Sequence, residues 1–198
     1  MKKIKLLLII LFAIIGALII YNHFEKIKPK EEEINKFSTE YTLVDSENIF
    51  EYNSIDEVID ILSNQTGIVF MCTPESNWCQ HYAYHLNNIC KKNNIQKIHY
   101  INITEYRELN TTKYQKLVDL LENYIYVNDI GIKKIYMPDL TFVKNGEIIA
   151  HDNETSLVNS ELVIENYWTN NKITEFNSKI SKYIELLNKE EEEIKGDD

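Results

Sequence analysis

Residues 67–79 read GIVFMCTPESNWC, and this stretch decides the fold. Gly67 opens an apolar run that ends at Cys72, and a strand with apolar side chains on both faces is typical of a buried, mostly parallel sheet. A Thr-Pro-Glu turn follows, and a helix is expected from about Ser76 to Lys92. Ser76 suits the start of that helix because its hydroxyl can accept a backbone N–H. The stretch therefore predicts a buried strand that turns directly into a helix.

The segments on either side alternate between helical and strand patterns. Upstream, Ser54 and Glu57 form a capping-box pattern at the start of an amphipathic helix. Downstream, the apolar run at 97–103 predicts a second strand. Thr112 and Gln115 repeat the capping pattern, which predicts another helix. Strands joined by helices in this way indicate parallel pairing.

The C-terminal half predicts a hairpin and a last helix. Asn145-Gly146 separates two apolar runs, 135–143 and 147–150, and a tight type I′ turn needs the positive φ that these two residues tolerate. Apolar residues at helical spacing then run from Ile173 to Leu187. With parallel strands first and an antiparallel hairpin last, the chain is expected to form one α/β domain with a central mixed sheet flanked by helices.

Two local motifs resemble the thioredoxin superfamily. The first is the strand, turn and helix start at residues 68–79, which is similar to the strand, Pro-x-Cys-x-Trp-Cys turn and helix of that family. The second is Met137-Pro138 with the hairpin that follows, which looks like the family's cis-proline strand. The resemblance covers about residues 41–187, and it implies a thioredoxin-like fold.

The resemblance also implies which residues contact a substrate. In thioredoxin-like proteins the proline loop faces the active-site turn and helps to bind substrate cysteines. We therefore expect the strand of Phe70 to lie beside the strand of Phe142, with Pro138 opposite Ser76. The candidate contact residues are Ser76, Trp78, Met137 and Pro138. An ordinary trans proline at the start of an edge strand is the alternative for Pro138.

Ser76 stands where the family's motif has its first cysteine. Thioredoxin-type catalysis needs a thiolate at the helix N-terminus, where the helix dipole and unpaired N–H groups lower the pKa of the thiol. A hydroxyl neither ionises near neutral pH nor forms a disulfide. The standard dithiol exchange is therefore not expected here, and helix capping is the structural role of Ser76.

Cys79 and Cys72 are the remaining candidate catalytic residues. Cys79 matches the family's second cysteine, and it shares an apolar helical stripe with Ala83, Leu86 and Cys90, so both cysteines of that stripe are expected to be buried. Cys72 and Cys79 enclose six residues, a loop that a disulfide can close in an oxidising compartment. Two unpaired structural cysteines are the favoured interpretation, and the alternative is a disulfide that acts as a staple or as a displaced redox centre.

His81 and His85 lie four residues apart on the predicted helix, a spacing at which two imidazoles can share one metal ion. The helical rotation turns both away from Cys79, and no further ligand converges on them. We interpret them as solvated histidines of the polar face and expect no metal or other cofactor.

Trp78, Tyr82 and Tyr84 cluster near the start of the same helix. Exposed aromatic rings beside the Pro138 loop could form a groove for an extended peptide. Packing of the helix against neighbouring loops is the other interpretation, and we adopt it for these residues.

The chain begins with a targeting or anchoring segment. Residues 1–5 are rich in lysine, and residues 6–21 form an unbroken apolar run. The run is short for a hydrocarbon core of about 30 Å, so a cleaved signal peptide is the alternative, but no small-residue cleavage site follows it. We predict a single transmembrane anchor with a cytoplasmic N-terminus and an extracytoplasmic domain.

Three further segments complete the predicted organisation. They are a charged linker at 22–37, the thioredoxin-like domain at 38–188 and an acidic tail at 189–198. The abundance of Ile, Asn and Lys indicates AT-rich coding in a bacterium.

The formal charge of −10 and the isoelectric point near 5.0 exclude nucleic acid as a first choice of partner, because phosphate backbones select basic surfaces. Two functions remain. The first is a membrane-tethered module without dithiol activity that binds an exported peptide or protein. The second is a thiol-disulfide oxidoreductase that uses Cys79 alone or a Cys72–Cys79 pair. Nothing in the sequence predicts an oligomeric state.

Overall fold

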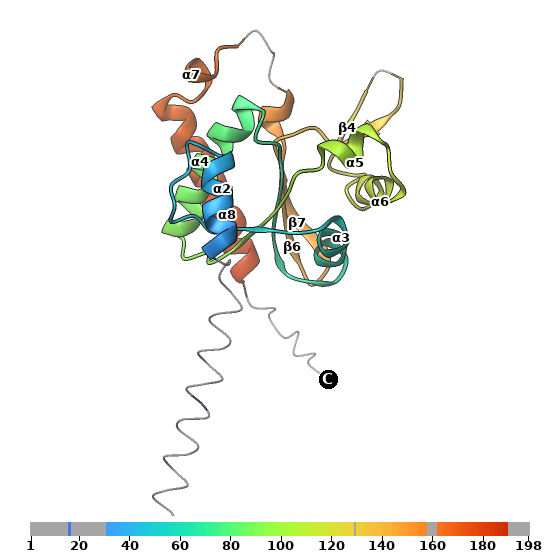
Figure 1. The fold of residues 1–198 in the computed structure, drawn as a ribbon, viewed down its shortest axis with the longest axis horizontal. Helices are drawn as coiled ribbons and strands as arrows, with labels where there is room; N and C mark the ends of the chain where they lie inside the picture. Colours follow the sequence, from blue (N-terminus) through green and yellow to red (C-terminus); the bar gives the residue numbers. More distant parts are fainter. Residues whose placement is uncertain (1–15, 17–30, 129, 158–161, 190–198) are drawn as a thin grey trace, which may run out of the picture.

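A computed structural model describes residue 16 and residues 31–128, 130–157 and 162–189. Its centre is a five-stranded sheet (Figure 1), with the strands in the order β1 (Phe50–Tyr52), β3 (Ile98–Ile101), β2 (Gly67–Met71), β6 (Asp139–Lys144) and β7 (Glu147–Asp152). Strands β1, β3 and β2 are parallel, whereas β6 pairs antiparallel with β2 and β7 pairs antiparallel with β6. The mixed sheet therefore has parallel strands on one side and the predicted hairpin on the other.

Helices cover both faces of this sheet (Figure 1). One face carries α2 (Glu31–Glu40), α4 (Asn77–Lys92) and α8 (Asn170–Asn188), and the other carries α3 (Ile55–Asn64) and α6 (Thr112–Leu120). Successive strand residues point to opposite faces, so Phe70 packs in the first cluster and Val69 in the second. This central mixed sheet flanked by helices confirms the predicted fold class, and the fold is thioredoxin-like.

Several short elements complete the described chain. They are α5 (Thr104–Glu108), β4 (Tyr126–Val127), β5 (Lys133–Lys134), a 3-10 turn (Glu154–Leu157) and α7 (Ile164–Tyr167). Strands β4 and β5 form a separate two-stranded sheet. None of these elements was predicted, because each is too short to display a hydrophobic period.

Helix starts follow the capping residues with one correction. The Ser54 and Glu57 capping box forms at α3, and Ser76 caps α4. At α6 the cap is Thr111, whose hydroxyl accepts the N–H of Tyr114, and not the predicted Thr112. The capping-box pattern with Gln115 favoured Thr112, but the backbone starts the helix one residue earlier and uses the hydroxyl of Thr111.

The hairpin between β6 and β7 turns at Asn145 and Gly146, both with positive φ, as predicted. The Gly146 N–H donates to the carbonyl of Gln65, just beyond the end of α3. Its φ is 77°, and a β-carbon built there would lie 2.2 Å from the Ser63 carbonyl oxygen. The turn therefore needs glycine both for its backbone conformation and for its close approach to α3.

Helix α2 begins inside the segment predicted as a charged linker, 22–37, so folded structure starts earlier than the predicted domain boundary. Phe37 is fully buried, and its ring stacks on Tyr41 at 4.3 Å and on Phe50 at 3.9 Å between centroids. The sequence did not predict this helix because its residues are mostly charged or polar, and Phe37 is its one fully buried side chain.

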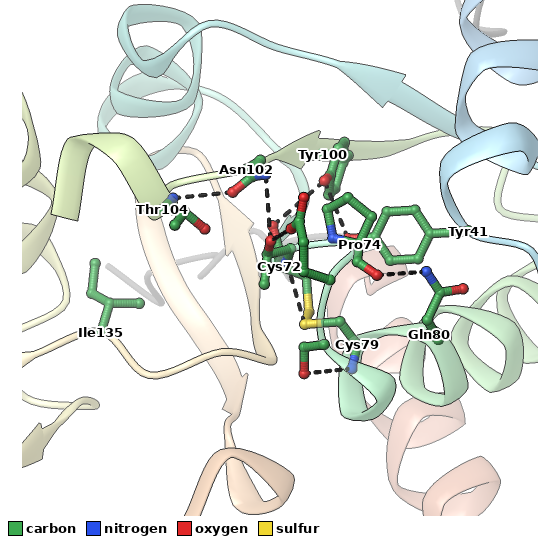
Figure 2. Close-up of a disulfide and its surroundings, with 12 residues drawn as sticks. Tyr41, Cys72, Pro74, Cys79, Gln80, Tyr100, Asn102, Thr104 and Ile135 are labelled. Carbon is green, nitrogen blue, oxygen red and sulfur yellow. Dashed lines mark hydrogen bonds between the residues drawn. A yellow bond between two sulfur atoms is a disulfide. The ribbon is translucent and has the colours of Figure 1, made fainter. Parts of the chain in front are cut away.

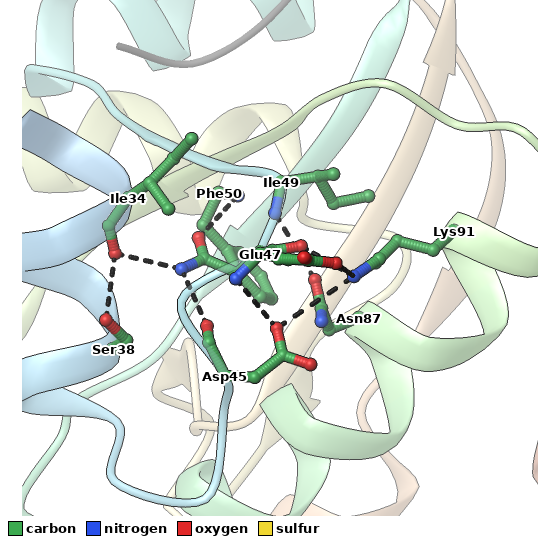
Figure 3. A network of polar contacts seen from close by, with 9 residues as sticks. Ile34, Ser38, Asp45, Glu47, Ile49, Phe50, Asn87 and Lys91 are labelled. Carbon is green, nitrogen blue, oxygen red and sulfur yellow. Dashed lines mark hydrogen bonds and ion pairs between the residues drawn. The ribbon is translucent and has the colours of Figure 1, made fainter. Parts of the chain in front are cut away.

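Polar contacts hold α2 and the following loop against α4 (Figure 3). The Asn48 side chain donates to the Ile34 carbonyl at 2.9 Å, and Asn87 on α4 accepts the Ile49 N–H at 3.3 Å. Lys91 donates to the Glu47 carbonyl at 2.7 Å. These bonds tie the N-terminal helix to the domain core.

Apart from Gly16, the predicted anchor at 6–21 lies outside the described residues, as do 1–5, 22–30 and 190–198. Among the residues that are described, no helix has the length and apolar character that a membrane crossing requires.

A buried histidine in β3 should make stability depend on pH. His99 is 9% exposed, and its Nδ1 lies 3.0 Å from the Asn53 side-chain oxygen. Burial lowers the pKa of His99 to about 4, and Lys97 adds to the effect while Glu57 opposes it. The unfolded chain binds this proton near pH 6.5, so the free energy of unfolding should fall as the pH drops from about 6.5 to about 4.

Over that pH interval, we expect the free energy of unfolding of His99→Gln to fall by about 1 to 3 kcal/mol less than that of the native protein. Urea unfolding of both proteins at pH 7 and pH 4.5 measures the difference. An identical pH dependence in the two proteins would show that His99 is not titrating as its burial requires.

Candidate functional site

The turn between β2 and α4 brings the two candidate cysteines together. Cys72 follows the last residue of β2, Cys79 lies in the first turn of α4, and the two form a disulfide with Cα atoms 5.8 Å apart (Figure 2). The sequence left this pairing open. Both residues are 0% exposed, so the bond lies beneath the turn and not on the surface.

Hydrogen bonds fix the turn that covers the disulfide. Gln80 donates to the Pro74 carbonyl at 2.8 Å (Figure 2). It also donates to the Glu40 carbonyl at 2.8 Å, and so joins the turn to the end of α2. The Thr73 hydroxyl contacts Glu75 and receives a long bond of 3.5 Å from Asn102. Hydrogen bonds thus connect the turn to α4, to the end of α2 and to Asn102, which follows β3.

Ser76 occupies the helix start, as the sequence predicts. Its hydroxyl accepts the Cys79 N–H at 3.4 Å, and its own N–H donates to the Thr73 carbonyl at 3.2 Å. Ser76 is partly exposed, whereas Cys79 is buried one turn further along α4. The position at which a dithiol enzyme exposes its nucleophile therefore carries a hydroxyl.

The apolar stripe predicted for α4 is confirmed, since Cys79, Ala83, Leu86 and Cys90 are all fully buried. Cys90 is unpaired, and burial raises the pKa of its thiol well above the usual range. Cys90 is therefore a core residue and not part of the site.

The Met137–Pro138 peptide bond is cis, as the resemblance implied, and the trans alternative is wrong. Asp139, the first residue of β6, pairs with Met71 in the sheet, so Pro138 lies just before β6 and next to the position of Cys72. The same pairing places Phe142 opposite Ile68, which confirms that the strands of Phe70 and Phe142 are neighbours. Pro138 is buried and Met137 half-buried.

Asp139, directly after the proline, is a buried carboxylate that sequence reasoning missed. Its side chain lies 3.0 Å from His151 Nε2 and accepts a 3.4 Å bond from the Thr141 hydroxyl. Burial alone would lower the pKa of His151, but the Asp139 carboxylate, its hydrogen bond and the Asp152 carboxylate raise it. An acid beside a proline in an apolar run was the signal available in the sequence.

Tyr82 does not line a surface groove. It is fully buried, its hydroxyl donates to Asp152 at 2.7 Å, and Lys179 from α8 contacts the same carboxylate at 2.9 Å. Burial and the neighbouring carboxylate raise the pKa of Tyr82. The phenol therefore belongs to a buried polar network between α4, β7 and α8.

Trp78 and Tyr84 differ in their surroundings. Trp78 is half-buried and packs edge-on against Tyr167 of α7, with ring centroids 5.1 Å apart. Tyr84 is 42% exposed. The packing interpretation holds for Trp78 and Tyr82, and Tyr84 is the ring of this group that solvent reaches most.

The interpretation of His85 as a solvated residue is wrong. Its ring lies 4.4 Å from that of Trp168, which covers it from the segment between α7 and α8, and burial lowers the pKa of His85 to about 4. The helical period assigned His85 to a polar face, but the segment before α8 folds over that face. Within the described ranges, no group of three or more His, Cys, Asp or Glu residues is arranged to hold a metal ion.

The geometry limits the chemistry that this site can perform. A partner thiol cannot reach the buried Cys72–Cys79 bond unless the turn opens. The Thr73 N–H lies 3.3 Å from Cys79 Sγ, close to the N-terminus of α4, so these groups would stabilise a thiolate on Cys79 after reduction.

Comparison with known proteins adds no argument to the description of the chain. No family model matches the chain, and no curated protein matches it. Among solved structures the chain is similar to the crystal structure of thioredoxin O2 from Arabidopsis thaliana in the oxidized state, with 11% identity and a TM-score of 0.39 over 67% of this chain and 92% of that one. The description of the fold as thioredoxin-like rests on the strand order, the hairpin and the position of the proline in the chain itself.

Proposed function

We propose that this protein is a membrane-tethered, extracytoplasmic thioredoxin-like module that binds an exported peptide or protein without standard dithiol exchange. The observation that carries the proposal is the combination of Ser76 at the start of α4 with two fully buried, disulfide-bonded cysteines. Dithiol exchange requires an accessible thiolate, and this arrangement supplies none. The tether rests on the lysine-flanked apolar segment at 6–21.

The disulfide supports binding by fixing the recognition turn. It closes a short loop between β2 and α4, which restricts the unfolded chain and holds residues 73–76 in one conformation. The half-buried Trp78 follows that turn, and the half-buried Met137, held by the buried Pro138, lies beside the end of β2. A preformed surface of this kind binds an extended segment with a smaller ordering cost than a mobile one.

The test uses the full chain in lipid vesicles and an unfolded, carboxymethylated polypeptide as probe. We expect insulin reduction at the background rate, together with saturable binding of the probe that weakens about tenfold in Trp78→Ala, because an aromatic anchor of an interface is removed. Lys116→Ala, an exposed change on α6, is the control and should bind as the native protein does. Failure of the native protein to bind any unfolded polypeptide would contradict the proposal.

A displaced redox centre is the second candidate, favoured by the Thr73 N–H near Cys79 Sγ. In that case the native protein would reduce insulin, and the activity would survive Ser76→Ala but disappear in Cys72→Ser and in Cys79→Ser. Mass spectrometric thiol counting under denaturing conditions complements the assay, since one free thiol is expected from three cysteines in the disulfide-bonded protein.

A further inference from the structure

A cleft of about 340 Å³ lies between α4, the segment around α7 and the first turn of α8, away from the disulfide turn. These three helical segments occupy the same side of the sheet (Figure 1). The cleft walls are formed by Leu43, His81, Tyr84, His85, Trp168 and Ile173, together with Glu165. Its volume is near the lower end of small-molecule sites, which measure about 300 to 1,000 Å³.

The back wall of the cleft is rigid and aromatic. Trp168 is 8% exposed, packs edge-on against Phe176 at 5.3 Å between ring centroids, and lies tilted against His85 at 4.4 Å. Neighbouring packed rings prevent the wall from collapsing into the cleft. A preformed aromatic wall is typical of a site for a small ligand.

The rim of the cleft is apolar and exposed. Leu43 and Tyr84 are large side chains that are 43% and 42% exposed, and the Tyr84 ring packs edge-on against His85 at 5.1 Å between centroids. Apolar surface of this kind beside a concavity indicates that something covers it. The ligand therefore has an apolar body.

The charged residues near the cleft favour a ligand of positive charge. Among the described residues that line the cleft, Glu165 is the one carboxylate, and none is a lysine or an arginine. Burial keeps His85 neutral near pH 7, because it lowers the pKa of that ring to about 4. Lys92 lies in an adjoining cleft that shares Tyr84, His85 and Ile173. The chain as a whole carries a formal charge of −10, which attracts cations.

We propose that this cleft binds a small organic ammonium compound with one aromatic or aliphatic body. The body would contact Leu43 and Ile173, the ammonium group would pair with Glu165, and the Trp168 and Tyr84 rings would surround the cation. Aromatic faces attract cations through their quadrupole, and this attraction adds to that of the carboxylate. The proposal does not depend on the peptide-binding function, because none of its residues belongs to the disulfide turn or the proline loop.

The experiment measures binding of 2-phenylethylammonium and of 2-phenylethanol to the full chain by calorimetry at low salt. The two probes have the same body and differ in the ammonium group. We expect the ammonium probe to bind about tenfold more tightly, because the exposed Glu165 carboxylate and the aromatic rings of Trp168 and Tyr84 act together on the cation. The anionic probe 3-phenylpropanoate should bind more weakly than either.

Two variants separate the contribution of the Glu165 carboxylate from that of the Tyr84 ring. Glu165→Gln should remove the advantage of the ammonium probe while both probes still bind, and Tyr84→Ala should weaken both. Glu185→Gln changes the net charge equally at an exposed position of α8 outside the cleft, and it should leave the tenfold difference intact. Equal affinities for the ammonium and the alcohol in the native protein, or an unchanged preference in Glu165→Gln, would overturn the proposal.

Discussion

Ser76→Cys is expected to raise the rate of insulin reduction by at least about a hundredfold over the background of the native protein. Ser76 is partly exposed at the N-cap of α4, so a thiol there would be accessible and would face the unpaired N–H groups that lower its pKa. The native chain has no accessible thiol, because Cys79 and Cys72 are bonded and Cys90 is buried. The substitution supplies the one group that the site lacks.

The chemistry of the variant begins with its own disulfide. The introduced thiolate attacks Cys79 Sγ, the Cys72–Cys79 bond breaks, and Cys72 leaves as a thiolate that takes a proton from solvent. Dithiothreitol then reduces the new bond, and the reduced pair can attack insulin. Insulin turbidity with dithiothreitol measures the rate, Ser76→Ala is the inactive control, and Cys79→Ser added to Ser76→Cys should abolish turnover. No gain in Ser76→Cys would show that the local backbone does not present the helix start to a substrate.

Gly146→Ala is expected to lower the free energy of unfolding by about 3 kcal/mol or more. Two costs combine at this turn. A side chain at a φ of 77° costs about 1 kcal/mol, and its β-carbon would lie 2.2 Å from the Ser63 carbonyl oxygen and 2.7 Å from the carbonyl carbon. Both close atoms are backbone, so the hairpin or the end of α3 must move and the bond from Gly146 to Gln65 is strained or lost.

Gly131→Ala is a matched control for this effect. Gly131 also has a positive φ, 79°, but a β-carbon there would meet nothing within 4 Å. Gly131→Ala should lower the free energy of unfolding by only about 1 kcal/mol, which is the cost of the backbone conformation alone. Urea unfolding of the two variants measures the difference, and equal losses would mean that the hairpin does not lie against α3 as described.

The central elements of the fold were predictable because each carries a local sequence signal. Ser54 and Ser76 mark helix starts, and Asn145 with Gly146 marks the hairpin, by chemistry that depends on a few neighbouring residues. Strand β1 has three residues and is defined only by its pairing with β3, so no local pattern could reveal it. Helix α2 was hidden for a related reason, since Phe37 is buried by contacts with Phe50 and not by a helical stripe of its own.

The candidate site was predictable in its residues and not in its geometry. The sequence identified Cys72 and Cys79 but left their pairing open, because pairing depends on how sharply the turn brings two backbones together. Asp139 and His151 meet across the β6–β7 pair, at a separation that no spacing rule covers. His85 was assigned to solvent because helical periodicity describes a helix alone, without the segment that later covers it.

The rate at which Cys90 is alkylated can report how often the core of the protein opens. Cys90 is the one thiol of the chain outside the disulfide, and the packed layer between α4 and the sheet hides it from reagents. An alkylating reagent can modify it only while that layer is separated, so the labelling rate reports how often separation occurs. Measuring that rate with and without a bound partner would show whether binding at the surface makes the core open less often, with no change to the sequence of the protein.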